Sequence, residues 1–310
     1  MLKGLALTPP IIGRISIGKF VEKDGMRLPE KDDEFTITSQ VQNREGWVNH
    51  PLDKTLRKSE DAKLRSIPVR LIFDDPDLSL RANYTLFDRK TGRQMCVGNG
   101  ETCKRLTPQG LKTLPCPTPD ACELAAGGNC KPYGRLNVRI GDEDELGSFI
   151  FRTTGYNSIR TLSTRLKYFH AVSGGLLSTL PLELRLRGKS TSQSYRTPIY
   201  YVDLTVRAEM TLPTAVAAAI AQRDEWKALG FDQAALDEAS RKGFAAGMFE
   251  ESAEEVEGVL EEFYPEPTNT ADGKQEPANT ATANTGLAGK LAGKVLATSG
   301  AGGGIARGLP

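Results

Sequence analysis

Apolar and polar residues alternate along several stretches in the first two thirds of the chain. Leucines alternate with Glu and Arg over residues 181–187, and residues 198–207 alternate in the same manner. Residues 35–41 and 66–73 are also rich in β-branched and aromatic side chains, with Pro68 near the start of the second stretch, where a missing N–H donor is tolerated. The pattern predicts antiparallel strands with one buried face and one face toward solvent.

Two further pairs of short stretches are separated by turn residues. Residues 82–88 and 94–97 flank a basic turn at 89–93 that contains glycine, and residues 134–140 and 147–153 flank an acidic turn. Alternating stretches on either side of a short polar turn are typical of β-hairpins. We therefore expect two hairpins within the predicted sheet.

The spacing of apolar residues changes from two to three and four over residues 159–172, which predicts one amphipathic helix among the strands. Asn157 or Ser158 is expected to cap its start, and Gly174 its end. From residue 212 the helical spacing continues. Three short helices are predicted there, over 213–229, 232–249 and 252–263.

Beyond residue 264 the composition changes to Thr, Asn, Ala, Gly and Pro, with almost no large apolar residue, so residues 265–310 are expected to be disordered. The sequence thus predicts three parts: a β-rich body over 1–207, a helical acidic region over 208–264 and a disordered tail. The predicted fold class is α+β, with a mainly antiparallel β body, a cysteine loop and one packed helix.

Charge is distributed unevenly along a chain whose net charge is only +1. Residues 1–207 hold 32 Lys and Arg against 23 Asp and Glu, whereas residues 208–310 hold 8 against 16. The basic excess is densest over 148–207. This asymmetry indicates a polyanion-binding body with an acidic appendage, and the alternative is an ordinary solvated surface that is basic.

All five cysteines fall within a stretch of 35 residues, between Cys96 and Cys130, among Gly, Pro, Asn and Asp residues that form turns. Four thiolates on tight turns can bind one structural zinc, although these spacings are wider than those of common zinc fingers. Disulfides and unligated thiols are the alternatives. We predict zinc, with Cys116 and Cys122 among the ligands. The completing ligand is left open between Cys96, Cys103 and His50.

The rest of the sequence bears on location and catalysis. No secretory segment is recognised at the start, and nowhere do 18 apolar residues run together, so we expect a cytoplasmic protein with reduced thiols and no membrane contact. Only His50 and His170 occur, and neither a catalytic triad nor a phosphate-binding glycine loop is present. We therefore expect no enzymatic activity.

Aromatic residues are interleaved with cations in the basic stretch. Phosphates bind Lys and Arg, and unstacked bases stack on exposed rings, so this mixture suits a nucleic-acid or partner surface. The alternative is that many of these rings are the buried faces of strands. The residues predicted to form the surface are Arg152, Tyr156, Arg160, Arg165, Lys167, Lys189, Tyr195 and Arg196.

Two stretches carry a resemblance to a known family. Residues 116–136, with Cys116, Cys122 and Cys130, and residues 151–162 resemble phage and mobile-element proteins of the recombination directionality factor-like family, also labelled "hydrolase or metal-binding protein". The resemblance extends over about residues 1–207. Within the family pattern these three cysteines are the most characteristic and Cys103 the least regular, which favours Cys96 as the fourth zinc ligand.

The resemblance implies a function. Such a factor binds a large serine integrase on DNA, in a bacterial host, and turns integration into excision. The alternative that the residues also fit is a phage single-stranded-DNA-binding or annealing protein with a structural zinc, since a β body with a basic groove, interleaved aromatics and an acidic tail suits that role.

Overall fold

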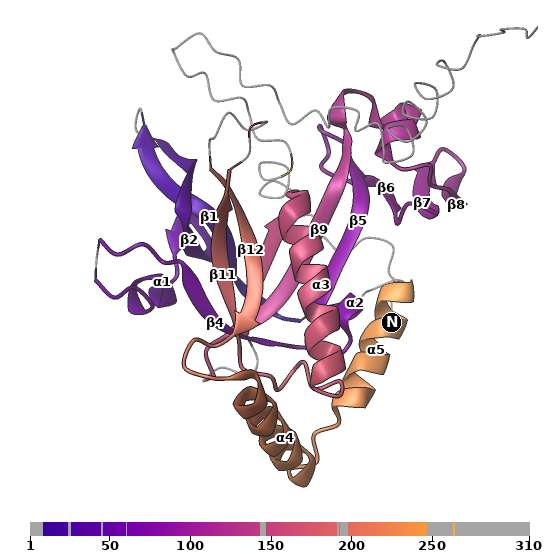
Figure 1. Cartoon of the computed structure of the whole chain (residues 1–310). Coiled ribbons are helices and arrows are strands. Elements are labelled where there is room, and N and C mark those ends of the chain that lie inside the picture. The colour runs from indigo at the N-terminus through magenta and orange to yellow at the C-terminus, as the bar shows by residue number, and fades with distance from the viewer. Residues whose placement is uncertain are drawn as a thin grey trace, which may run out of the picture. The chain divides into compact units, whose positions relative to one another are not determined.

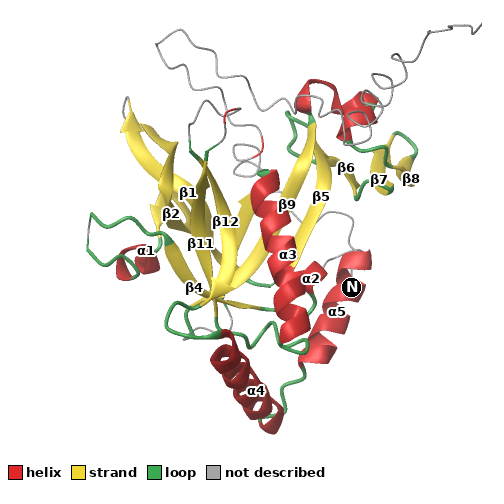
Figure 2. Ribbon diagram, in the orientation of Figure 1, coloured by secondary structure: helices red, strands yellow, loops and turns green. Residues whose placement is uncertain are grey.

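The computed structural model describes residues 9–23, 26–44, 46–59, 61–142, 147–190, 192, 198–246 and 263. These residues belong to one compact unit, Met1–Pro265, with an α+β fold of one large sheet and few helices (Figure 2). The strands are β1 (Ile11–Lys23), β2 (Met26–Asn43), β3 (Gly46–Asn49), β4 (Ser66–Leu71), β5 (Leu80–Phe87), β6 (Gln94–Gly98), β7 (Thr102–Thr107), β8 (Gly110–Pro115), β9 (Cys130–Ile140), β10 (Ser148–Thr153), β11 (Leu182–Lys189) and β12 (Ile199–Val206). The helices are α1 (Pro51–Thr55), α2 (Pro76–Ser79), α3 (Tyr156–Val172), α4 (Leu212–Ala228) and α5 (Gln233–Ala246), with 3₁₀ segments η1 (Pro119–Ala121) and η2 (Glu123–Gly128).

Strand β9 is the branch point of the sheet. The main path runs β3-β2-β1-β10-β9-β5-β6-β7-β8, and β4, β11 and β12 form a branch in which β4 also pairs with β9. One edge of β9 pairs with β10, and the other is shared between β5 and β4. All described pairs are antiparallel except β1 with β10. The sheet is therefore mixed but mainly antiparallel, which confirms the predicted fold class at this level.

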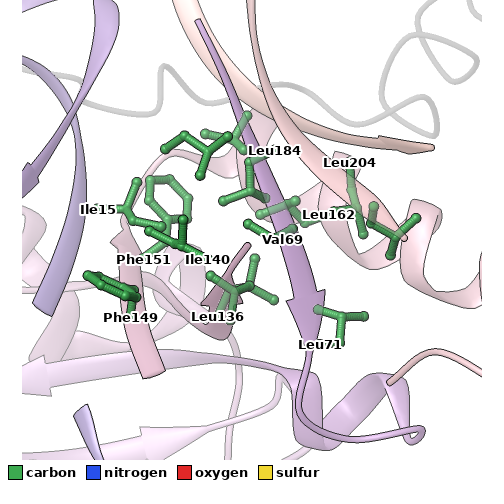
Figure 3. Close-up of a cluster of buried hydrophobic side chains, with 14 of the residues drawn as sticks. Ile15, Val69, Leu71, Leu136, Ile140, Phe149, Phe151, Leu162, Leu184 and Leu204 are labelled. Atoms are coloured by element: carbon green, nitrogen blue, oxygen red, sulfur yellow. The ribbon is translucent and has the colours of Figure 1, made fainter. Parts of the chain in front are cut away.

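The hydrophobic core lies on one face of this branched sheet. Leu136, Val138 and Ile140 alternate along β9 and pack with Phe149 and Phe151 of β10 (Figure 3). The side chains of β4, β11 and β12 that face inward complete the cluster. Because successive residues of a strand point to opposite faces, the other face of β9 carries Lys131, Tyr133, Arg135, Asn137 and Arg139.

Helix α3 covers the core face and one strand edge, and Figure 1 shows it in front of the sheet between β12 and β9. Ile159, Leu162, Leu166 and Phe169 are buried in or beside the core, as their spacing predicts. The predicted caps are wrong, since the N-cap is Gly155, which offers no side chain. Asn157 and Ser158 lie inside the first turn and bind other elements instead.

The helices that follow residue 207 pack on the β body. Ala215 and Ala219 of α4 belong to the main core, and Arg223 binds Asp74 at 2.7 Å. Asp237 of α5 accepts hydrogen bonds from the backbone N–H groups of Asp74 and Asp75, both at 3.0 Å. The division expected after residue 207 therefore does not mark a separate unit, because small alanines let α4 approach the core closely and buried polar bonds fix α5.

Most predicted elements are present with small shifts at their ends. The two predicted hairpins are β5–β6 and β9–β10, and the stretch 66–73 is β4. The pair β7–β8 within the cysteine region was not predicted. The predicted helix 252–263, apart from Phe263, and the predicted disordered tail lie outside the described residues. Among the described helices, none is long and apolar enough to cross a membrane.

Candidate functional site: a cysteine cluster beside a basic helix

The cysteines lie on one face of the sheet extension formed by β5 to β8 and the start of β9. Cys130 of β9 and Cys96 of β6 are both paired with Leu86 of β5, so they flank this residue on neighbouring strands. Cys103 of β7 is paired with Gly98, two residues along from Cys96. Since residues paired across strands share a face, these three thiols point to the same side of the extension.

The remaining two cysteines come from the loop after β8. The N–H of Cys116 donates to the carbonyl of Glu101 at 2.8 Å, which holds this residue against the β6–β7 turn. A side chain at Gly98 would lie only 2.8 Å from the Cys116 sulfur, so glycine is required there for the loop to close over β6. Cys122 precedes η2 and accepts the first bond of that turn from Ala125.

The five thiols affect one another electrostatically. Burial, followed by the proximity of all four other cysteines, raises the pKa of Cys130 to about 12. Burial and a hydrogen bond with Cys96 raise the pKa of Cys103 to about 11, and Cys116 adds to this effect. The guanidinium of Arg105 lies beside Cys96, Cys103 and Cys122 and has its own pKa raised, first by its hydrogen bond with Cys96. The fold therefore gathers all five cysteines into one cluster.

This cluster is not a closed metal site in the structure. All five cysteines are free thiols, and within the described parts of the chain no group of three or more His, Cys, Asp or Glu side chains is arranged to hold a metal ion. His50 belongs elsewhere. Its Nδ1 accepts a hydrogen bond from the N–H of Leu52 and caps α1, and its ring packs against Phe149 of β10. Since β9 and β5 separate β10 from β6, His50 is not part of the cysteine cluster.

The outer surface of α3 carries exposed cations and rings. Arg160 and Lys167 are exposed and lie two turns apart on the same side of the helix, because seven residues return almost to the same direction. Tyr156 and Tyr168, which are 60% and 48% exposed, lie on the same side. Exposed aromatic side chains of this size, together with cations, provide both stacking and phosphate contacts.

Other predicted surface residues are already engaged. Arg165 binds Asp203 of β12 at 3.0 Å, and Lys189 donates to Asn157 of α3 at 2.7 Å. Ser158 accepts from the backbone N–H of Val202 at 3.1 Å, so this first turn covers the edge of β12. These bonds fix α3 against β11 and β12. Tyr195 and Arg196 lie outside the described residues.

Arg152 does not lie on this surface. It is 7% exposed and sits on the face of β10 opposite the core and α3, paired across strands with Arg135. The alternation of the strand predicts its direction correctly, but that face of the sheet is covered rather than open to solvent. The predicted exposed surface is thus reduced to Tyr156, Arg160 and Lys167, with Arg165 and Lys189 at its border.

A pair of tyrosines joins the helix surface to the cysteine cluster. Tyr84 of β5 has its pKa raised by burial and then by its nearness to Tyr156, Asp120, Cys116 and Cys130. It therefore lies between the start of α3 and the thiols. The sequence analysis did not include Tyr84 or Arg105, although their strand positions in register with Gly98 and Cys96 would have placed them beside the cysteines once the hairpins were known.

Fold and site together define a basic α+β protein with a cysteine-rich sheet extension and no recognised catalytic group. Residues 12–207 match the Gp3-like family, which is described as recombination directionality factor-like. Because the match covers more than half of the chain, the protein belongs to this family, and the resemblance expected from the sequence is confirmed. No curated protein and no solved structure matches the chain.

Proposed function

We propose that this protein is a recombination directionality factor that binds a large serine integrase on DNA and switches it from integration to excision. The observation that carries the proposal is the family match over residues 12–207, which takes in the whole sheet, the cysteine extension and α3. We propose a regulatory, non-catalytic role in the cytoplasm of a bacterial host, where integrase and DNA are both present.

We assign the contact to the outer surface of α3. Arg160 and Lys167 are exposed there and Tyr156 and Tyr168 lie between and beside them, whereas the inward side of the helix is fixed in the core. Substitution of exposed residues on a helix that is held by its other side leaves the fold in place. An interface with exposed aromatic and cationic side chains at its centre has the composition that binding hot spots favour.

The test is recombination between the two junction sites of an integrated element, with integrase in the presence and absence of the protein. Wild type is expected to promote excision, and the double variant Arg160→Ala, Lys167→Ala is expected to lose at least about tenfold in the concentration that gives half-maximal excision. The matched control is Lys58→Ala, Lys227→Ala, which removes two exposed cations far along the chain from α3. A control variant that fails equally, or no effect of the wild type on excision, contradicts the proposal.

A second function is favoured by one observation, the exposure of Tyr156 and Tyr168 on the same side of α3 as the cations. Such rings could stack on the bases of single-stranded DNA, at about 1–3 kcal/mol per base. This alternative predicts that Tyr156→Ala, Tyr168→Ala weakens binding to single-stranded DNA in the absence of integrase. If wild type shows no such binding, the annealing role is rejected.

We also propose that the cysteine cluster binds one structural zinc. The support is chemical: five thiols lie on one side of a small sheet, and Cys130 is close enough to the other four for each to affect its pKa. Thiolate ligands suit zinc, and binding would need deprotonation and a small approach of the sulfurs. Zinc would then fix the loop 116–130 to β6, beside Tyr84 and the start of α3.

A further inference from the structure

The face of the sheet opposite the core carries a set of arginines on four neighbouring strands. Arg152, Arg135 and Arg81 are directly paired across β10, β9 and β5, so they form one row. Arg14 of β1 belongs to the same face, since it pairs with Ile150, which in turn pairs with Asn137 of β9. Arg139 follows two residues beyond Asn137. We call Arg14, Arg81, Arg135, Arg139 and Arg152 the arginine face.

The arginine face is covered. Arg14, Arg81, Arg135 and Arg152 are 5%, 9%, 3% and 7% exposed. Described aromatic rings lie over several of them, including Trp47 at 3.8 Å from Arg14 and Phe244 of α5 at 3.8 Å from Arg81. A ring stabilises a cation only modestly, and burial of several like charges together needs compensating negative charge nearby.

Both ends of a glutamate-rich stretch of this chain lie on that face. Phe244, at the end of α5, stacks on Arg81. Phe263 is fully buried against Phe87 and Tyr133, at ring distances of 4.7 and 5.7 Å, and its carbonyl accepts a hydrogen bond from Lys131 at 3.0 Å. Lys131 and Tyr133 share the face of β9 that carries Arg135. The chain between these two phenylalanines therefore begins and ends on the arginine face.

The length and charge of that stretch match the surface. Eighteen residues separate Phe244 from Phe263, and they contain seven glutamates and no Lys or Arg: Glu250, Glu251, Glu254, Glu255, Glu257, Glu261 and Glu262. From Arg81 to the Lys131 pair is four residues along β5, or about 13 Å, and from β5 to β1 is three strand spacings, or about 14 Å. Even as a helix, 18 residues would span about 27 Å, enough to cross the face.

We propose that the arginine face is a polyanion-binding surface that the chain's own acidic segment, residues 247–262, occupies in cis. The segment is held at its two ends by Phe244 on Arg81 and by Phe263 in the Phe87–Tyr133 pocket. Its carboxylates neutralise the arginines as phosphates would, so the full chain hides this surface from duplex DNA. Release of the segment exposes a second, larger basic surface on the side of the sheet away from α3. This inference does not rest on the recombination role.

The test measures arginine exposure in the full chain. Selective arginine modification with phenylglyoxal, mapped by mass spectrometry, is expected to be slow at Arg81, Arg135 and Arg152 in wild type. It should become roughly 5- to 150-fold faster in Glu250→Gln, Glu251→Gln, Glu254→Gln, Glu255→Gln, which loses about four carboxylates of cis coupling. Arg160 on α3, which is exposed, is the internal reference and should not change.

The matched control removes four acidic charges elsewhere, with Glu209→Gln, Asp224→Asn, Glu225→Gln, Glu238→Gln, all at exposed positions outside the acidic segment. A second variant, Phe263→Ala, releases one anchor without a change of charge and should act in the same direction. Equal modification rates in wild type and both segment variants, with native circular dichroism, would overturn the assignment of the occupant.

Binding of duplex DNA tests the chemistry of the surface. The four-glutamine variant should bind more tightly than wild type and the control at low salt, with its salt dependence steeper by roughly 0.9 units for each phosphate gained. If the arginines become reactive but duplex binding and its salt slope stay at the wild-type values, the arginine face is not a polyanion-binding surface. Neither measurement contains integrase, so both are independent of the recombination assay.

Discussion

The two ends of strand β9 lie in regions held together by different physics. Leu136, Val138 and Ile140 are buried in a core shared by six other strands and α3, whereas Cys130 lies in the extension of β5 to β8. Within residues 94–115, Cys103 is the one buried hydrophobic side chain, and β8 has no buried residue at all. The body can therefore be stabilised by apolar burial, and the extension cannot.

The comparison shows why the cysteines occur where they do. A three-stranded sheet with one wet face and a loop of 3₁₀ turns buries too little apolar area for independent stability. Five thiols gathered on one side offer another means of holding it, through a metal that links β6, β9 and the loop after β8. The position of the extension beside Tyr84 and Tyr156 makes its order relevant to the helix surface.

The same substitution in the two regions should have very different effects. Leu136→Ala in the core end of β9 is expected to lower the free energy of unfolding by about 3 kcal/mol, because it leaves a cavity among fully buried side chains. Leu114→Ala in β8 is partly exposed and should cost about 0.5 kcal/mol or less. Urea denaturation followed by circular dichroism measures both, and similar losses in the two variants would remove the distinction between the regions.

A second substitution tests how far the body extends. Asp237→Ala is expected to destabilise by about 1–3 kcal/mol, since it leaves the N–H groups of Asp74 and Asp75 without their acceptor in a half-buried site. Glu238→Ala, the exposed neighbour on α5, should stay within about 0.5 kcal/mol of wild type. If thermal unfolding of Asp237→Ala matches that of Glu238→Ala, α5 does not contribute to the stability of the body.

The extension should respond to loss of a thiol without unfolding of the body. Reduced wild-type protein is expected to contain about one zinc per chain, and Cys116→Ser and Cys130→Ser should lose it, whereas global urea unfolding shifts by about 0.5 kcal/mol or less. Metal content is measured by inductively coupled plasma mass spectrometry, with Met95→Leu in β6 as the control. Wild-type protein that carries no zinc after purification under reducing conditions contradicts the metal proposal.

The smallest expected effect is a pH dependence at the edge of the body. Hydrogen bonds from Arg207 and then Arg70 hold the pKa of Asp142 below its ordinary value of 3.8. A carboxyl with a lowered pKa in the folded state stabilises the protein above about pH 4, and this stabilisation is lost as the pH falls below that value. Since the side chain is 50% exposed, the contribution is about 0.5 kcal/mol.

Asp142→Asn should therefore reduce stability slightly at pH 7 and flatten its fall between pH 5 and 3. The measurement is a set of urea titrations across that range, with Asp224→Asn on the exposed side of α4 as the control. Identical pH profiles for wild type and Asp142→Asn would remove the Arg70–Asp142–Arg207 contact from the account.

The sequence predicted the elements whose signal is local. Alternation located β4, β11 and β12, turn residues located the hairpins β5–β6 and β9–β10, and the spacing from Ile159 to Phe169 located α3. The pair β7–β8 was missed because its strands bury one side chain, Cys103, and therefore carry almost no periodic apolar signal. The covered arginine face was also missed, since Arg81, Arg135 and Arg152 have the polar pattern of a wet face and are covered only through tertiary contacts.

For the site, the sequence predicted the cysteine stretch and the cations of α3, but not their proximity. That proximity depends on Tyr84 and Tyr156, which are 72 residues apart in the chain and meet because β5 and β10 both pair with β9. Arg165, Lys189 and Arg152 were predicted as ligand contacts by charge alone. The structure engages the first two with Asp203 and Asn157 and covers the third.

The most direct test of the comparison is hydrogen–deuterium exchange of the full chain before and after removal of metal with a chelator under reducing conditions. The account predicts faster exchange in β6, β7 and β8 and in the loop that bears Cys116 and Cys122, with no change in β4, β11 or the Leu136–Ile140 end of β9. Exchange that is unchanged throughout, or that accelerates equally in the core strands, would contradict the claim that the two regions are held together by different interactions.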